Sequence, residues 1–190
     1  NVDELEWSFL HQEDFPLGVS VTRADGTFYE SDGRYYPQGT PDYNAGREAF
    51  AQSFVPYLDG NGSYAAAGEE LVAGLGMKLS YDFQEMFTQC PPDGFVIQDT
   101  GGIGAAYCPA LRDTIYVNGQ GNNYPNILYD LYYIDLLKHE FAHVRTTEIC
   151  ATSQPVVTLG GVHFEATASS YAAMFLGADR DRLAWSAADY

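Results

Sequence analysis

The sequence predicts one α+β domain over residues 1–190, in which a small and mostly antiparallel sheet packs on a central helix. Three observations lead to this prediction. Short β-rich runs separated by glycine turns occur in the first two thirds of the chain, and two segments with helical hydrophobic spacing come late. A hydrophobic content of 46% is also enough to form one buried core.

The first elements are a hairpin and a helix. Apolar residues alternate with polar ones over 17–21, and the Asp25-Gly26 pair suits a tight turn before a second strand at 27–29. These residues predict a two-stranded antiparallel hairpin. After a loop rich in glycine, proline and tyrosine, phenylalanines recur at helical spacing and predict a helix over 47–57.

The middle of the chain is predicted to hold one long helix and two strands. Apolar residues line one helical face over 63–86, and they are Leu71, Leu75, Leu79, Phe83 and Met86. A Cys-Pro-Pro sequence ends this helix. Short β-rich runs follow at 95–97 and 114–117, separated by glycines, and we expect both to be strands.

Two late helices complete the predicted fold. Apolar residues recur at helical spacing over 127–141 on nearly all sides, which indicates a central buried helix. A linker containing two glycines leads to a second helix over 164–176, and a short third helix is expected over 179–186. The central helix carries the polar residues that matter most for function.

Charge limits the kinds of partner that the chain can bind. Nine lysines and arginines stand against 26 aspartates and glutamates, so the formal net charge is −17. Such a surface repels phosphate backbones and anionic lipid, which argues against nucleic-acid and polybasic membrane binding. No run of about 18 apolar residues occurs, because charged residues interrupt the most apolar stretch. A monomer is the expected state.

Composition and cysteines favour a secreted or extracytoplasmic protein. The chain is acidic, has only two lysines and 15 tyrosines, and carries three cysteines. A disulfide between Cys90 and Cys108 would close the glycine-rich loop 91–107, and this is the preferred pair. Cys150 could instead pair with either of them.

The central helix contains His139-Glu140-Phe141-Ala142-His143, which has the arrangement His-Glu-x-x-His. Residues four apart lie on one face of an α-helix, so both imidazoles can reach one metal ion. Glu140 then lies close enough to act on water bound to that ion, as in zinc catalysis. The alternative is a pair of core or solvated histidines, but such groups in so apolar a helix would need a compensating partner.

A catalytic zinc needs three protein ligands and one open position, so a third ligand must be found. Extension of the motif to a third histidine is excluded, because Ile149 occupies that position. Glu148 lies about 140° around a continuous helix from His143 and would reach the ion only if the helix broke. Glu165 follows the glycine-bearing linker, which can reverse the chain and bring its carboxylate to the histidines.

The segment that begins Glu165-Ala166-Thr167-Ala168 resembles the second motif of the gluzincins. In that clan a glutamate on a downstream helix completes a zinc site of two histidines and one glutamate. The resemblance therefore implies that His139, His143 and Glu165 are the three ligands of Zn²⁺. One position departs from the clan, because gluzincins often carry an aspartate four residues after this glutamate and this chain has Ser169. Serine can orient His139 but carries no charge, so we expect a lower zinc affinity.

The residues before the zinc motif extend the likeness. Ala106-Tyr107-Cys108-Pro109, followed by Ile115-Tyr116-Val117, is similar to the bacterial neutral zinc metallopeptidase family. The resemblance covers residues 105–176 and implies a zincin-like fold, in which the small sheet packs on the zinc-binding helix. The run at 114–117 lies where gluzincins place the edge strand that pairs with substrate, although an interior strand would show the same pattern.

These observations together predict a metallopeptidase-like catalytic domain, a metalloendopeptidase rather than an exopeptidase. A peptide or protein is the expected substrate. Glu140 would act as the general base that takes a proton from a zinc-activated water, which attacks the peptide carbonyl. His163 or a tyrosine such as Tyr116 could donate a second hydrogen bond to the oxyanion. Tyr171 lies about 240° around the helix from Glu165 and is expected in the core.

Two other functions stay open at this point. A deformylase-type amide hydrolase also uses His-Glu-x-x-His, with a cysteine as third ligand, and Cys108 could fill that role. A non-catalytic secreted zinc-binding domain would instead interact with a protein partner through its tyrosine-rich surface. Glu140 and the open position expected at a three-ligand zinc favour the enzyme.

Overall fold

The computed structural model describes residues 20–22, 28–30, 56–90, 102–150, 164–179 and 181–183. Helices and a small sheet occur together in these ranges, which confirms the α+β class. In chain order the elements are β1 (Ser20–Thr22), β2 (Phe28–Glu30), α3 (Ala65–Gly74), β3 (Lys78–Ser80), α4 (Phe83–Gln89), β4 (Ala105–Tyr107), β5 (Thr114–Val117), the 3₁₀ helix η3 (Asn126–Tyr129), α5 (Leu131–Cys150) and α6 (Phe164–Phe175).

The first predicted hairpin is confirmed. β1 and β2 are antiparallel, with Val21 opposite Tyr29. The predicted helix at 47–57 lies outside the described residues except for its last two, which are not helical. The predicted strand at 95–97 also lies outside the described residues.

The prediction of a single long helix over 63–86 is wrong, because this range contains α3, β3 and the start of α4. Gly76 adopts a left-handed φ of 78°, which a residue without Cβ tolerates best. Met77 then donates its backbone N–H to Val72 at 3.0 Å, a bond of the Schellman motif that ends helices. The chain continues as β3 and becomes helical again after Asp82, whose side chain accepts a backbone N–H of α4.

The sheet of β3, β4 and β5 is mixed rather than mostly antiparallel. Its order is β3-β5-β4, with β3 parallel and β4 antiparallel to β5. β5 is the central strand and all four of its residues are buried. Of the two interpretations of 114–117, the interior strand is therefore confirmed and the substrate-pairing edge is wrong. Among the described strands β4 pairs only with β5, and β4 also contacts α5.

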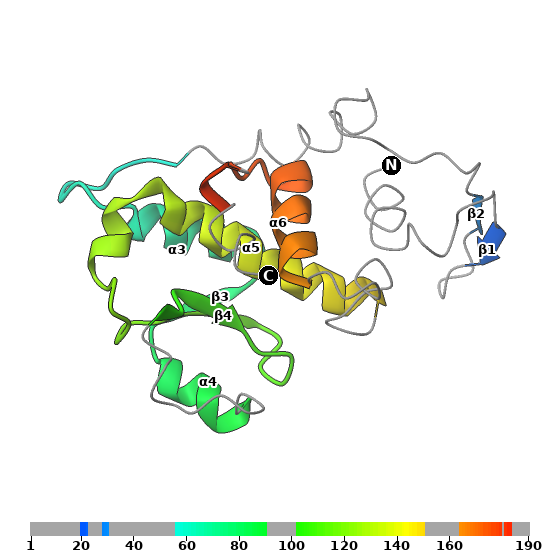
Figure 1. The fold of residues 1–190 in the computed structure, drawn as a ribbon, viewed down its shortest axis with the longest axis horizontal. Helices are drawn as coiled ribbons and strands as arrows, with labels where there is room; N and C mark the ends of the chain where they lie inside the picture. Colours follow the sequence, from blue (N-terminus) through cyan, green and yellow to red (C-terminus); the bar gives the residue numbers. More distant parts are fainter. Residues whose placement is uncertain are drawn as a thin grey trace.

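α5 is the central helix, as predicted, and α3, α6, β4 and β5 all contact it (Figure 1). It begins after Asp130, whose carboxylate accepts the backbone N–H of Tyr132 at 2.9 Å. The residues just before it form η3, so the α-helix starts at Leu131 rather than at Ile127. α6 confirms the helix predicted over 164–176 to within one residue.

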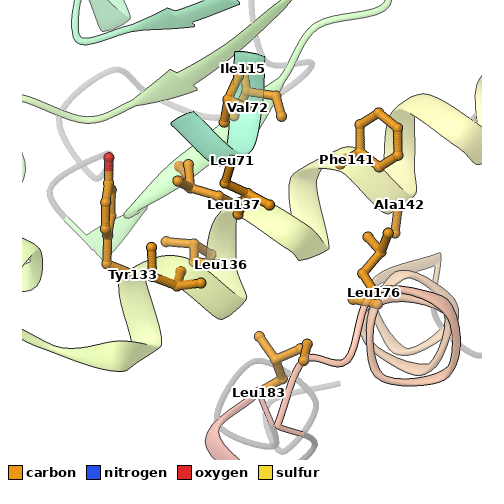
Figure 2. Packing of buried hydrophobic residues seen from close by; sticks show 14 of the residues in the cluster. Leu71, Val72, Ile115, Tyr133, Leu136, Leu137, Phe141, Ala142, Leu176 and Leu183 are labelled. Atoms are coloured by element: carbon orange, nitrogen blue, oxygen red, sulfur yellow. The ribbon is translucent and has the colours of Figure 1, made fainter. Parts of the chain in front are cut away.

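The core lies around α5. Figure 2 shows Leu137 of α5 beside Leu71 of α3, and Ala142 of α5 beside Leu176, which directly follows α6. Ile115 of the central strand belongs to the same buried cluster. α5 and α6 therefore pack on each other through apolar side chains, and this packing fixes the two helices that carry the predicted site.

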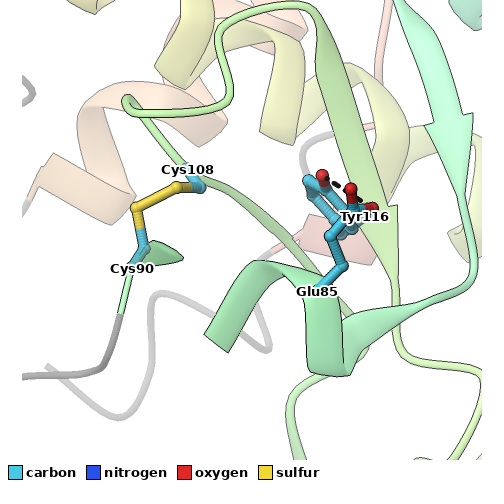
Figure 3. The surroundings of a disulfide bond; sticks show 4 residues. All are labelled: Glu85, Cys90, Cys108 and Tyr116. Atoms are coloured by element: carbon cyan, nitrogen blue, oxygen red, sulfur yellow. Dashed lines mark hydrogen bonds between the residues drawn. A yellow bond between two sulfur atoms is a disulfide. The ribbon is translucent and has the colours of Figure 1, made fainter. Parts of the chain in front are cut away.

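The preferred disulfide is confirmed. Cys90, at the end of α4, is bonded to Cys108, which directly follows β4, and their Cα atoms are 6.0 Å apart (Figure 3). The bond ties α4 to the edge of the sheet that contacts α5. Cys150 is the last residue of α5, and the structure does not describe its side chain. None of the described helices is long and apolar enough to cross a membrane.

Candidate metal centre

Two histidines of α5 form one half of the candidate centre. His139 and His143 are one helical turn apart and both are buried, with 2% and 8% of their surface exposed. Their ring centroids are 4.8 Å apart with an interplanar angle of 84°. The Nε2 atoms of both rings point to the same place, because they lie 3.2 Å from each other.

α6 supplies the other half. Glu165 lies in its first turn, and its Oε2 atom is 2.8 Å from Nε2 of His139 and 3.5 Å from Nε2 of His143. Ser169, one turn later, places its hydroxyl 3.0 Å from Nδ1 of His139. Four residues that the sequence predicts to act together thus meet where α6 packs on α5.

The three ligand atoms fit a metal ion of zinc's size. Bonds of about 2.0–2.1 Å in tetrahedral geometry place neighbouring ligand atoms about 3.3–3.4 Å apart. The three separations between His139, His143 and Glu165 are 2.8, 3.2 and 3.5 Å, which bracket this value. In the part of the chain that the structure describes, these residues form the one group of ligating side chains with suitable geometry. The identity of the metal remains a prediction.

The electrostatics of Glu165 also suit a cationic ligand. Burial raises the pKa of its carboxyl, but the hydrogen bonds to His139 and His143 outweigh burial and hold that pKa well below its ordinary value. The carboxylate therefore stays ionised across the neutral range. An ionised carboxylate beside two imidazole nitrogens is a suitable set of ligands for a divalent ion.

Glu140 lies beside the ligands in a different environment. It is 95% buried, and burial raises the pKa of its carboxyl to about 7. His139 lowers this pKa, Glu165 raises it, and a hydrogen bond from the backbone N–H of Tyr107 lowers it. The contact with Tyr107 places β4 next to Glu140. Sequence reasoning missed this contact, because any residue can supply a backbone N–H.

The alternative ligands are not at the centre. Glu148 forms an ion pair with Arg145 at 2.6 Å, and 55% of its side chain is exposed. Cys108 is engaged in the disulfide, so it offers no thiolate to a metal, and the deformylase-type hypothesis loses its third ligand.

Neither of the residues named as oxyanion donors is found at the centre in the part of the chain that the structure describes. The hydroxyl of Tyr116 donates to Glu85 of α4 at 3.3 Å, in the cluster around the disulfide (Figure 3). The hypothesis that Tyr116 donates to the oxyanion required its hydroxyl to lie at the metal ligands. The hydroxyl lies at Glu85 instead. His163 lies outside the described residues. Tyr171 is fully buried and packs on Phe175, as predicted.

The two carboxylates of the centre act on one tyrosine of α5 that the sequence prediction left out. Tyr132 lies on α5 seven residues before His139, and seven residues turn an α-helix through about two full turns. Its ring is partly buried, and the carboxylates of Glu140 and Glu165 both raise the pKa of its phenol, after the larger effect of burial. The seven-residue spacing was visible in the sequence, but it extends beyond the five-residue motif.

Comparison of the chain with known protein families, with curated proteins and with solved structures found no match. The zincin-like fold and the resemblance to the gluzincins thus remain predictions that rest on the residues themselves. What the structure adds is the geometry: two helices bring two imidazoles and one carboxylate together, and a hydroxyl lies at the far nitrogen of the His139 ring.

Proposed function

We propose that the protein is a zinc-dependent peptidase that hydrolyses peptide bonds, with Glu140 as its general base. The observation that carries this proposal is the convergence of the ligand atoms of His139, His143 and Glu165 beside the buried carboxyl of Glu140. Three protein ligands leave a fourth position for water or substrate, which distinguishes catalytic from structural zinc sites.

Zn²⁺ at these ligands would polarise a water molecule and the carbonyl of a bound peptide. Glu140 is suited to the accompanying proton transfers, because a carboxyl whose pKa is about 7 can accept and return a proton near neutral pH. It would take the proton from the attacking water and deliver it to the leaving amine. The backbone N–H of Tyr107 orients the carboxylate during both steps.

The position of β4 supports an extended peptide as substrate. β4 pairs with β5 on one side and has no second partner among the described strands. An extended peptide can pair with such an edge through main-chain hydrogen bonds. Because Tyr107 of β4 contacts Glu140, a peptide on this edge would lie next to the general base. Binding along a strand favours an endopeptidase over an exopeptidase.

The disulfide supports a location outside the cytoplasm. Disulfides persist in oxidising compartments and are rare in the reducing cytosol. The bond between Cys90 and Cys108 is compatible with the predicted secreted or extracytoplasmic protein. Mass mapping of unreduced peptides from protein isolated from its natural source tests this, and two free thiols at these positions would contradict it.

The proposal is tested with Glu140→Gln, which keeps the size of the side chain and removes the base. Glu148→Gln is the matched control, because it neutralises an exposed glutamate of the same helix. Both variants and the wild type are loaded with zinc, analysed for metal per chain and assayed on a broad peptide library. We expect one zinc per chain in all three, and a rate about 10²–10⁴-fold lower in Glu140→Gln alone.

Two results would contradict the proposal. Equal hydrolysis by Glu140→Gln and wild type would show that Glu140 is not the base. Bound zinc without hydrolysis by the wild type would favour the non-catalytic zinc-binding domain instead.

A further inference from the structure

The sheet of β3, β4 and β5 lies between two apolar clusters. Side chains alternate between the two faces of a strand, and Ala105, Ile115 and Val117 belong to the main core around α5. Tyr116 belongs to a second cluster that α4 forms with the sheet, and Ala106 packs against that cluster. Figure 1 shows α4 on the opposite side of the sheet from α5. The sheet therefore separates α4 from the helices that carry the candidate ligands.

The second cluster is small, so the disulfide contributes much of the attachment of α4. Among the described residues this cluster has four buried members, whereas the main core has 22. α4 has only seven residues, and such a short helix is not stable by itself. A hydrogen bond of 3.3 Å from Tyr116 to Glu85 and the bond between Cys90 and Cys108 also join α4 to the sheet. Release of α4 would leave the main core closed, because the two clusters are separate.

The backbone of β4 connects the disulfide to the candidate centre. In an antiparallel pair hydrogen-bonded positions alternate, and the 2.9 Å bond from the N–H of Asn118 to the carbonyl of Gly104 sets this alternation. Tyr107 is three positions after Gly104, so its N–H points away from β5. That N–H donates to the carboxylate of Glu140. Cys108 directly follows, so the disulfide is one residue away from the backbone group that holds Glu140.

We infer that the disulfide between Cys90 and Cys108 is a redox-sensitive switch, and that its oxidised form holds the end of β4 in position at the general base. The inference rests on the proposed function, because it assigns the role of base to Glu140. With the bond broken, α4 leaves the sheet and the N–H of Tyr107 is no longer fixed. The protein is then fully active only in an oxidising compartment, such as the proposed extracytoplasmic location.

The reductant of this switch is a dithiol. One of its thiolates attacks Sγ of Cys90, which is partly buried, whereas Cys108 is only 1% exposed. The attack forms a mixed disulfide and releases Cys108 as a thiol. The second thiol of the reductant then displaces Cys90, so that the dithiol becomes a disulfide. Two electrons and two protons pass to the chain, which now carries two thiols.

The test compares the zinc-loaded full chain before and after reduction. A phosphine is the reductant, removed before measurement, because the thiolates of a dithiol would bind zinc themselves. The double variant Cys90→Ala/Cys108→Ala is the matched control, since it has no bond to reduce. Cys150→Ser, which keeps the bond, shows whether the third cysteine takes part. Zinc per chain, hydrogen exchange of single backbone amides, and kcat/KM on cleaved peptides are measured for each protein.

We expect one zinc per chain in every form. Reduction should make the amides of α4 and of Tyr107 exchange at least about tenfold faster, while those of α5 and α6 stay protected. It should lower kcat/KM about 10–100-fold, because the base is misplaced, and reoxidation should restore the rate. The double variant should match the reduced wild type and not respond to the phosphine. Cys150→Ser should respond as the wild type does.

The outcomes separate this inference from the proposed function. Unchanged exchange of the Tyr107 amide and unchanged activity after reduction overturn the switch and leave the peptidase standing. Loss of zinc together with protection in α5 and α6 would show that the bond merely stabilises the whole fold, which also overturns the switch. A wild type that cleaves no peptide contradicts the peptidase. In that case, selectively faster exchange of α4 and Tyr107 after reduction would still support redox control of the contact.

Discussion

Ser169 controls how His139 presents its ring to the centre. Its hydroxyl is 3.0 Å from Nδ1, while Nε2 of the same ring faces Glu165. When a metal occupies Nε2, the proton must be on Nδ1, and Ser169 is placed to accept it. An uncharged acceptor fixes the orientation of the imidazole but raises its basicity less than a carboxylate would.

This arrangement predicts opposite effects of two substitutions. Ser169→Ala should weaken zinc binding about 10–100-fold, because His139 loses its hydrogen-bond acceptor. Ser169→Asp should tighten zinc binding relative to Ser169→Ala, because a carboxylate restores the acceptor and adds charge. Competition titration with a zinc indicator measures both. Ser80→Ala on β3 is the control, and equal affinities in all the proteins would remove Ser169 from the centre.

The sequence predicts the centre at residue level wherever helix spacing determines it. His139 and His143 follow from a spacing of four, and Ser169 follows Glu165 by the same interval. Helix spacing cannot show that α6 packs on α5 with Glu165 next to the two histidines. The choice of Glu165 therefore needed the resemblance to a known clan. The contact from Tyr107 could not be predicted, because its backbone N–H is independent of the side chain.

At the scale of elements, hydrophobic spacing predicts which segments form helices or strands better than it predicts where each helix or strand ends. The apolar stripe continues from α3 through β3 into α4, yet Gly76 ends the first helix. A glycine in a helical pattern is compatible with either a continuing helix or a C-terminal cap. The backbone hydrogen bond that ends the helix cannot be predicted from the spacing of apolar side chains. Strand order is also hidden from the sequence, because the parallel pairing of β3 with β5 joins residues that are 36 positions apart, such as Lys78 and Thr114.

A buried ion pair holds the segment after α6 against α5. Asp135 of α5 is almost fully buried, and it pairs with Arg182 at 2.5 Å. Burial raises the pKa of Asp135, and Arg182 opposes that shift only in part. Lys138, also buried on α5, lies 3.4 Å from the Gly177 carbonyl that follows α6. These contacts fix the C-terminal end of α6, whereas the ligand Glu165 lies at its other end.

Replacement of Arg182 by methionine should destabilise the fold in a pH-dependent way. The buried Asp135 would lose its cation, and we expect a loss of about 1–3 kcal/mol at pH 7, reduced from the fully buried case because Arg182 is 38% exposed. A carboxyl whose folded-state pKa is raised adds stability below its unfolded pKa, of about 3.9, and that stability is lost as the pH rises through the folded-state pKa. The loss should therefore be smaller at pH 4.

Urea unfolding at pH 4 and pH 7 measures this difference, with each variant compared with the wild type at the same pH. Lys78→Met is the control, since its ion pair with Asp113 is well exposed and should contribute little. An equal loss at both pH values would show that Asp135 is not the group responsible.

At the scale of the whole molecule, the centre joins the two helices that organise the main core. α3, α5, α6 and the sheet contribute to one buried hydrophobic cluster, with α5 in the middle. The proposed ligands lie on α5 and α6, so an ion bound there would couple these helices in the folded state alone. A metal that binds the folded chain and not the unfolded one stabilises the fold in proportion to its concentration and affinity.

Removal of zinc should therefore lower the thermal stability of the entire domain. Free zinc at 100 times its Kd stabilises the folded state by about 2.7 kcal/mol, which corresponds to about 5–10 °C in Tm for a chain of this size. Scanning calorimetry with and without a chelator measures the shift, and His143→Ala, which lacks one ligand, should show little of it. A wild-type Tm that does not respond to zinc would mean that His139, His143 and Glu165 do not bind it, and an equal shift in His143→Ala would place the zinc elsewhere.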